Sequence, residues 1–243
     1  MPVRDEQDNI LPLAAEIVAA LEPVCVFEIV YVDDGSADAT PKRLEEAQRK
    51  YAVLRVARHA RCCGQSQAVS TGVRLARAGL IATLDGDGQN DPADLPVMLE
   101  RMRALAPQER DNLMLAGFRH RRHDSRVKLI SSRLARQARA VLLHDDTPDS
   151  GCGIKMFTRA AFLELPNFDH MHRFLPVLMK RRGGNVESVP VNHRPRERGV
   201  SKYGISNRLW VSLVDLFGVM WLQRRARRPT VSLFENEPPE NVM

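Results

Sequence analysis

Four apolar segments alternate with three helix-like segments over the first 120 residues, and this order limits the folds that the chain can adopt. The apolar segments have the length and composition of buried strands, and the segments between them carry helix-capping residues and helix formers. We therefore predict strands over 28–34, 53–57, 79–85 and 112–118, and helices over 36–51, 64–78 and 91–105. Because parallel strands need long crossover connections, this order predicts an α/β fold: a mostly parallel, Rossmann-like sheet flanked by helices.

The pattern changes after residue 120. A basic amphipathic helix is predicted over 124–143, and strands over 153–159 and 186–195. The longest apolar run, 209–222, has 14 residues and contains Asp215, whereas a bilayer-spanning helix needs roughly 20 apolar residues. We expect this run to form a helix that lies either at a membrane interface or in a buried core.

These patterns divide the chain into three parts. Residues 1–204 form the predicted globular domain, 205–228 an amphipathic helix with a basic end, and 229–243 a disordered tail rich in proline and glutamate. In such a fold "PVRDE" would follow an apolar first strand, yet only Met1 precedes it. Two interpretations stay open: a truncated first strand, or a natural start upstream of Met1.

The charge is distributed unevenly along the 243 residues. Residues 1–100 have a net charge of −6 and residues 101–243 a net charge of +12. The basic part is expected to face an anionic partner, such as a phosphorylated substrate or a membrane surface. Nucleic acid is a weaker alternative, because few aromatic residues interleave the arginines and no known binding motif occurs.

The cysteines and the amino terminus indicate the compartment. Four cysteines occur without any C-x-x-C spacing, which argues against a zinc site and favours reduced thiols. Charged residues at positions 4–6 come too early for a secretory leader. We expect a cytoplasmic protein.

Carboxylates gather where two predicted strands end. Asp33 and Asp34 follow one strand, and Asp85 and Asp87 follow another within "DGDGQNDP". Because ligands of such sheets bind at the carboxyl ends of strands, these acids are expected to share one edge. Two carboxylates at i and i+2, with Gln89 nearby, suit Mg²⁺ or Mn²⁺, and a cation held there could neutralise a departing diphosphate.

Two ordinary interpretations compete with this metal site. An EF-hand calcium loop needs glycine at its sixth position and glutamate at its twelfth, but counting from Asp85 gives Asn90 and Pro96. A solvated Gly/Asp turn is the other interpretation. The second acidic strand end favours the metal site over that turn.

Five motifs in order carry a resemblance to a known family. "PVRDE", "VDDGS", "DGDGQNDP", "SGCGIKMFTR" and "GVSKYG" resemble family 2 glycosyltransferases of the GT-A fold, and within them the dolichyl- and polyprenyl-phosphate sugar synthases. The resemblance runs from Pro2 to about Arg228. It implies a metal-dependent, inverting hexosyltransferase that uses a UDP- or GDP-sugar donor and a polyprenyl phosphate acceptor.

The resemblance also implies roles for particular residues. The nucleotide would be bound by Pro2, Val3, Glu6, Asp34 and Asp85. The metal would be held by Asp85, Asp87 and Gln89. The acceptor phosphate would be bound by Arg119, Arg133, Ser150, Arg198 and Lys202, and the residues central to catalysis would be Asp85, Asp87 and Arg119.

A phosphate acceptor suits the basic part of the chain. The second pKa of a phosphate monoester is near 6, so the nucleophile is already anionic at pH 7 and needs no general base. Arginine and lysine can hold that anion beside an anionic donor. A hydroxyl acceptor is the alternative within the family, with Asp169 as base. A nucleotidyltransferase would want a Gly-rich phosphate loop, which "PVRDEQDN" does not offer, and a non-enzymatic binder of anionic polymers is a further alternative.

The 205–228 helix bears on where the enzyme works. An apolar helix followed by "QRRARRP" can lie in the interface of an anionic bilayer. We therefore expect peripheral attachment to the cytoplasmic face of a membrane for cell-envelope glycan or glycolipid synthesis. A homo-oligomer or a membrane-protein partner stays open.

Overall fold

The computed structural model describes residues 1–119, 137, 139–196 and 206–227. The strands are β1 (Pro2–Val3), β2 (Ile29–Asp33), β3 (Leu54–Arg58), β4 (Leu80–Thr83), β5 (Leu113–Arg119), β6 (Lys155–Thr158) and β7 (Asn185–Val191). The helices are α1 (Ile10–Leu21), α2 (Thr40–Lys50), α3 (Gln65–Leu75), η1 (Pro92–Asp94), α4 (Leu95–Arg103), α5 (Pro107–Asp111), α7 (Arg159–Leu163), η2 (Met171–Arg173), α8 (Leu175–Arg182) and α9 (Ser206–Arg224).

The strands form two sheets. One has the order β1-β2-β3 and is parallel throughout. The other has the order β4-β6-β5-β7, in which β6 runs antiparallel to both of its neighbours while β5 and β7 are parallel. The predicted α/β class with a mostly parallel sheet is thus confirmed, and β6 is its antiparallel member.

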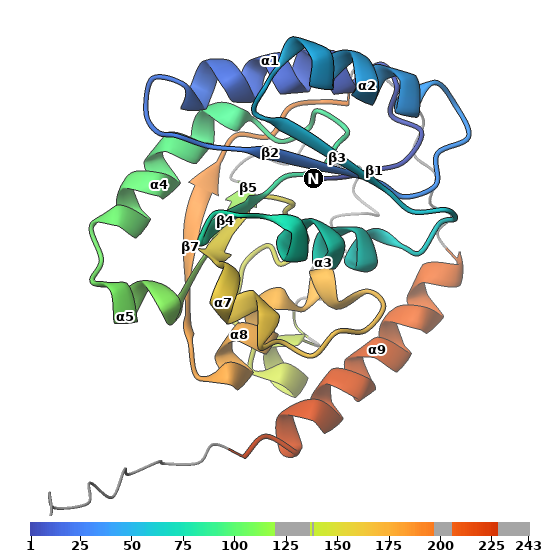
Figure 1. Cartoon of the computed structure of the whole chain (residues 1–243). Coiled ribbons are helices and arrows are strands. Elements are labelled where there is room, and N and C mark those ends of the chain that lie inside the picture. The colour runs from blue at the N-terminus through green and yellow to red at the C-terminus, as the bar shows by residue number, and fades with distance from the viewer. Residues whose placement is uncertain (120–136, 138, 197–205, 228–243) are drawn as a thin grey trace, which may run out of the picture.

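Helices cover both faces of this strand layer (Figure 1). Helices α1, α2 and α4 lie on one face, and α3, α7 and α8 lie on the other. Buried side chains of α1, β2, α2 and β3 form one core cluster, and those of α4, β5 and β6 form a second. A third cluster joins α3, α7, α8 and α9. Apolar side chains on both sides explain why the predicted strands are nearly continuous apolar runs.

The predicted elements of the first 120 residues match the observed ones with shifts of a few residues at their ends. The segment predicted as one helix over 91–105 is divided, with η1 capped by the side chain of Asp91 before α4 begins. Most of the helix predicted over 124–143 and all of the tail 229–243 lie outside the described residues. The three-part division of the chain stays a prediction. Within the described part of the chain, none of the helices is long and apolar enough to cross a membrane.

Candidate active site

The two acidic strand ends lie side by side, as predicted. Val3 pairs with Asp33 in the parallel ladder, and the Asp34 amide donates to the Val3 carbonyl over 2.9 Å. Val3 also packs on Gly86, where a Cβ atom would collide with the Val3 side chain and lie 2.9 Å from the Pro2 oxygen. The short strand β1 therefore joins the turn after β2 to the turn after β4, and residue 86 must be glycine.

The Asp85 side chain is closely surrounded by other residues. Its Oδ1 accepts a 2.9 Å hydrogen bond from Gln65 Nε2, and its amide donates to Asn90 Oδ1 over 2.9 Å. A Cβ atom at Gly153 would collide with its carboxylate. Burial, and then the charge of Asp87, raise the pKa of Asp85 to about 6, although Lys155, Arg119 and Gln65 act in the opposite direction.

Asp87 and Gln89 are adjacent to this carboxylate. Asp87 Oδ1 accepts a 3.1 Å hydrogen bond from the backbone N–H of Gln89. Asp87 Oδ2 lies 3.8 Å from Arg196 Nη1. Arg196 also forms an ion pair with Glu6. The sequence did not single out Arg196, because one arginine among several in "HRPRERG" carries no local signal of its partners.

The acidic pair fits a divalent cation. Burial and like charge make the Asp85 carboxylate costly to ionise in the metal-free protein, and a cation would relieve that cost. The donors available are carboxylate and amide oxygens, which Mg²⁺ and Mn²⁺ prefer. Asp85, Asp87 and Gln89 are thus the residues that would hold such an ion.

Asp34 is saturated by hydrogen bonds from its own chain. Its Oδ1 accepts from the Cys63 amide and pairs with His59 Nδ1, both at 2.8 Å, and its Oδ2 accepts from the Gly64 amide at 2.8 Å and the Cys62 thiol at 3.2 Å. Burial raises the pKa of Asp34, but these hydrogen bonds outweigh it, so the pKa lies below its usual value.

That saturation bears on the predicted role of Asp34. Ligand atoms of Asp34, His59 and Cys63 lie within 4.8 Å of one another, yet a carboxylate has about four lone-pair sites and all of them are engaged. In this structure Asp34 orders the loop that leads into α3. A nucleotide base would have to displace one of its donors.

Glu6 lies on the amino-terminal side of the same edge. Its carboxylate accepts a 2.7 Å hydrogen bond from Asn9 Nδ2 and pairs with Arg196. Burial raises the pKa of Glu6 in spite of these two partners, and the nearby Asp87 adds to the shift. Pro2, Val3 and Glu6 therefore lie beside the acidic turns, as the predicted nucleotide pocket requires.

Arg119 ends β5 and is fixed by a buried acid. Its Nε and Nη2 donate to the two carboxylate oxygens of Asp149 over 2.6 and 2.9 Å. The neighbouring Ser150 is buried and accepts from Arg139. Arg133, Arg198 and Lys202, which were also predicted to bind the acceptor phosphate, lie outside the described residues.

Lys155 is a buried cation that the sequence analysis missed. Its ammonium donates to the Cys152 carbonyl from the first residue of β6. Burial lowers its pKa, while Cys152, Asp85 and Asp149 raise it. A lysine inside the predicted apolar strand 153–159 was the available signal, since an unpaired lysine is rarely fully buried.

The segment around η2 closes the other side of the site. Asp169 Oδ1 lies 3.1 Å from where a Cβ atom of Gly64 would be, next to Gln65, which bonds Asp85. His172 Nδ1 lies 2.8 Å from Ser66 Oγ, and burial, then Arg173, lower its pKa to about 3, so the ring is neutral. Asp169, the alternative base, thus lies beside the residue that precedes Gln65, the hydrogen-bond donor to Asp85.

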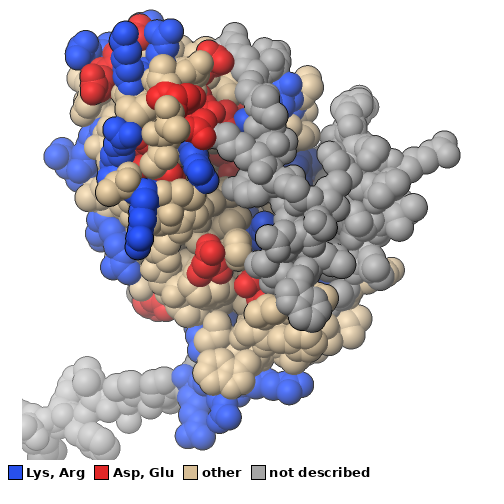
Figure 2. All heavy atoms as spheres, turned by 90° about the vertical axis from the view of Figure 1, so that its right-hand side faces the viewer, with Lys and Arg blue, Asp and Glu red and all other residues tan. Residues whose placement is uncertain are grey.

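One face of the molecule carries charge unevenly. Figure 2 shows acidic side chains gathered in the upper part of this face, with basic side chains beside them, and a basic group at its lower end. Helix α9 ends at Arg224, which Arg225 follows.

Comparisons with known proteins agree with this geometry. A family model described as glycosyl transferase family 2 matches residues 1–165. Dodecaprenyl-phosphate galacturonate synthase of Rhizobium johnstonii is 33% identical over 94% of this chain and 68% of its own length. Undecaprenyl-phosphate 4-deoxy-4-formamido-L-arabinose transferase of Pseudomonas aeruginosa is 31% identical over 90% of this chain. The chain spans 63% of the length of that second relative.

Solved structures show the same fold. Glucosyl-3-phosphoglycerate synthase from Mycobacterium tuberculosis, in complex with Mn²⁺, UDP-glucose and phosphoglyceric acid, superposes with a TM-score of 0.63. It is 15% identical over 96% of this chain and 80% of its own. The same enzyme with Mg²⁺ and UDP gives a TM-score of 0.64 at 16% identity, over 89% of this chain and 77% of that one. At such identities the likeness concerns the fold.

Proposed function

The chain belongs to glycosyl transferase family 2, and we propose that it moves a sugar from a nucleoside diphosphate to the phosphate of a polyprenyl lipid. Membership confirms the predicted family and enzyme class. The observation that carries the proposal is the pairing of Asp85 and Asp87 beside β1, with the basic residues Arg119 and Lys155 near enough to stabilise the charge of Asp85. This arrangement suits a reaction between two phosphate-bearing substrates.

The donor side of the proposal rests on the acidic turns. Mg²⁺ or Mn²⁺ bound by Asp85, Asp87 and Gln89 would supply charge neutralisation for the departing diphosphate. In the solved structures of the synthase described above, Mn²⁺ accompanies UDP-glucose and Mg²⁺ accompanies UDP. Pro2, Val3 and Glu6 are proposed to border the nucleotide, with Asp34 holding the adjoining loop.

The acceptor side needs cations and no base. In the proposed step an oxygen of the lipid phosphate attacks the anomeric carbon, and the bond from that carbon to the diphosphate breaks with its electron pair leaving on the diphosphate. Asp149 orients the Arg119 guanidinium with two hydrogen bonds, which positions a cation for the acceptor phosphate. The relatives named above are synthases and transferases of polyprenyl phosphates, which supports this acceptor class.

The test is a transfer assay. The full chain is incubated with a panel of labelled nucleotide sugars, polyprenyl phosphate in detergent and Mn²⁺ or Mg²⁺. We expect label in an organic-extractable, mild-acid-labile product. If label reaches only hydroxyl acceptors, and Asp169→Asn abolishes that transfer, the acceptor is a hydroxyl and the lipid proposal is wrong.

Metal binding is expected to weaken as the solution becomes acidic. The pKa of Asp85 in the metal-free protein is about 6, so below pH 6 a proton competes with the cation for this carboxylate. We expect the apparent Kd for Mn²⁺ to be nearly constant between pH 7 and 8 and to rise about fivefold between pH 6 and 5. Calorimetric titration with Mn²⁺ measures this, and a Kd that is flat down to pH 5 would contradict a role for Asp85 as ligand.

Peripheral membrane attachment is proposed to occur through α9. Its side chains Leu213, Val214, Phe217 and Trp221 are exposed, as are Val141 and Leu142 nearby. Arginines follow at the end of the helix, and an exposed apolar face with a basic end suits an anionic bilayer surface. We propose the cytoplasmic face, because all four cysteines are free, as is usual in a reducing compartment.

The doubly substituted variant Phe217→Glu, Trp221→Glu tests this attachment. Both side chains are more than half exposed, so the fold should tolerate the change, while binding to vesicles with anionic lipid should weaken at least about tenfold. Val97→Glu on α4, with 63% of its surface exposed on another part of the molecule, is the matched control. Equal vesicle binding by both variants in a flotation assay would exclude α9 as the attachment site.

A further inference from the structure

A cluster of oxygen, nitrogen and sulfur donors lies at the end of β2 and is distinct from the pair of Asp85 and Asp87. Ligand atoms of Asp34, His59 and Cys63 lie within 4.8 Å of one another. Asp34 follows β2, while His59 and Cys63 belong to the loop between β3 and α3. Because the donors come from two loops, the spacing of the cysteines, which argues against a zinc site, could not reveal this set.

The His59 ring is oriented through both of its nitrogen atoms. Nδ1 lies 2.8 Å from Asp34 Oδ1, and Nε2 lies 2.9 Å from the hydroxyl oxygen of Thr71 on α3. With its proton on Nε2, the ring would donate to Thr71 and direct the lone pair of Nδ1 toward the cluster. Histidine ligands of metal ions are usually held by a hydrogen bond from the other ring nitrogen in this way. Thr71 therefore supplies the outer contact that a metal-binding imidazole needs.

The loop also brings two thiols to the Asp34 carboxylate. The backbone N–H groups of Cys63 and Gly64 each donate to it over 2.8 Å, which fixes the loop without using any side-chain donor. The Cys62 thiol donates to Asp34 Oδ2 over 3.2 Å, and Arg4 Nη1 donates to the Cys62 sulfur over 3.0 Å. Both cysteines are exposed, so an ion has a path into the cluster from solvent.

We propose that Asp34, His59 and Cys63 form a binding site for one Zn²⁺ ion. Zinc is bound by imidazole nitrogen, thiolate sulfur and carboxylate oxygen, whereas Mg²⁺ and Mn²⁺ prefer oxygen ligands. The oxygen donors of Asp85 and Asp87 suit the harder ions. The two strand ends would therefore select different metals.

The ion takes the place of protons in the cluster. The hydrogen bonds to Asp34 hold its pKa below the usual value, so its carboxylate is already ionised at neutral pH. The proton that His59 shares with Asp34 moves to Nε2, which frees one lone pair on each residue for the ion. The Cys63 thiol gives its proton to solvent, so binding of each ion releases one proton. The backbone hydrogen bonds to Asp34 stay in place.

A bound ion would hold the loop that leads into α3. Gly64 has a φ of +92°, a left-handed value that glycine adopts at little cost, and it joins the cluster to Gln65. Gln65 Nε2 donates to Asp85 Oδ1 over 2.9 Å. Zinc at Asp34 would therefore fix the residue that orients the Asp85 carboxylate, without being a ligand of the donor substrate.

Calorimetric titration of the metal-free full chain with Zn²⁺, in excess Mg²⁺, tests the proposal. We expect one Zn²⁺ ion per chain whose binding depends on Cys63. Since the loss of an outer hydrogen bond alone costs about 10–100-fold in metal affinity, Cys63→Ser should weaken binding of this ion at least about 100-fold. His59→Asn should have a similar effect, and its side-chain amide can still donate to Asp34 and keep the loop in place.

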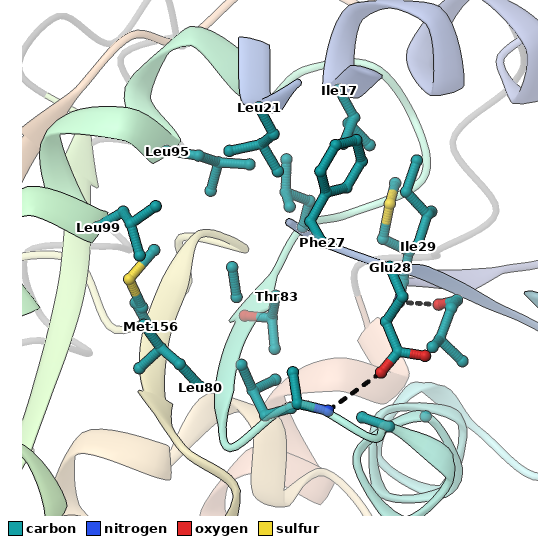
Figure 3. A pocket seen from close by; sticks show the side chains of 18 of the residues that line it. Ile17, Leu21, Phe27, Glu28, Ile29, Leu80, Thr83, Leu95, Leu99 and Met156 are labelled. Atoms are coloured by element: carbon teal, nitrogen blue, oxygen red, sulfur yellow. Dashed lines mark hydrogen bonds between the residues drawn. The ribbon is translucent and has the colours of Figure 1, made fainter. Parts of the chain in front are cut away.

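Co²⁺ reports sulfur ligation directly. The parent chain with Co²⁺ should show a thiolate-to-cobalt charge-transfer band in the near ultraviolet, and Cys63→Ser should abolish it. Cys25→Ser is the matched control, because Cys25 is also a free thiol but lines a separate, mostly apolar cavity with Leu21 and Phe27 (Figure 3). This control should bind Zn²⁺ and Co²⁺ as the parent does.

Three results would overturn the zinc site. They are a parent chain that binds no Zn²⁺ in excess Mg²⁺, an affinity that is unchanged in Cys63→Ser and His59→Asn, and a cobalt band that survives in Cys63→Ser. None of these readouts depends on sugar transfer, so they stand apart from the proposed function.

Discussion

Asp85→Asn is expected to reduce sugar transfer by at least about 1,000-fold while making the metal-free protein more stable at neutral pH. The loss follows from removing a ligand of the cation that would neutralise the leaving diphosphate, a contribution of several kcal/mol to the transition state. The loss of activity tests whether Asp85 binds the cation, and the gain in stability tests whether its buried charge destabilises the metal-free protein.

The gain in stability follows from the sign of the pKa shift. Folding raises the pKa of Asp85 from 3.8 to about 6, so the folded state holds the proton more tightly, and ionised Asp85 lowers the free energy of unfolding. This penalty is absent below pH 3.8, grows as the pH rises towards 6 and is complete at pH 7. Asparagine carries no charge and so avoids this penalty, and the variant should be more stable than the parent at pH 7 by up to about 3 kcal/mol.

Urea denaturation in EDTA at pH 4 and pH 7.5 measures this difference. The free energy of unfolding of the variant should exceed that of the parent at pH 7.5 and equal it at pH 4. Asp91→Asn in the same loop is the control, because Asp91 caps the Ala93 amide and asparagine caps as well. Full activity of Asp85→Asn would end the metal-site hypothesis, and a loss of stability at pH 7.5 would contradict the pKa argument.

Arg119→Ala should impair both stability and transfer. Asp149 is buried and receives two hydrogen bonds from Arg119, so truncation removes both of these bonds from a buried carboxylate, at a cost of about 3–5 kcal/mol. Transfer should fall at least about 100-fold if the guanidinium also binds the acceptor phosphate. The single variant cannot separate these two effects.

A second substitution separates them. In Arg119→Met, Asp149→Asn the buried charge is gone, so much of the stability should return while the KM for polyprenyl phosphate stays high. Arg101→Ala is the matched control, because its bidentate pair with Glu187 is exposed and should contribute little to stability. Recovery of transfer together with stability would show that Arg119 acts only by neutralising Asp149.

The sequence predicted the elements of this fold well where local patterns decide them. Apolar runs and caps located β2, β3, β4 and β5 and the helices between them, and the turns at 34 and 85–87 were placed on one edge. The antiparallel direction of β6 was not predictable, because it depends on which neighbours its edges meet. Binding of the acceptor phosphate by Arg133, Arg198 and Lys202 stays a prediction, because these residues lie outside the described ones.

The parts of the site that the sequence missed are long-range partners. Lys155 lies within a buried strand, and its effect on Asp85 comes from folding that brings β4 beside β6. Asp149 pairs with Arg119 over a separation of 30 residues. Arg196 pairs with Glu6 and Asp87 across the molecule. A short segment of sequence does not show which distant residues its side chains will contact. The carboxylates of "DGDG" lie within a few residues of one another, so the sequence alone revealed them.

The ion pair between Glu6 and Arg196 joins positions that are 190 residues apart. At bacterial or eukaryotic synthesis rates of about 5–20 residues per second, the arginine leaves the ribosome roughly 10–40 s after the glutamate. During that interval the nascent chain carries Glu6 and Asp87 without their cation. Loop closure over such a separation also slows folding. The acidic edge should therefore be the last part of the protein to mature, well after the local helices have formed.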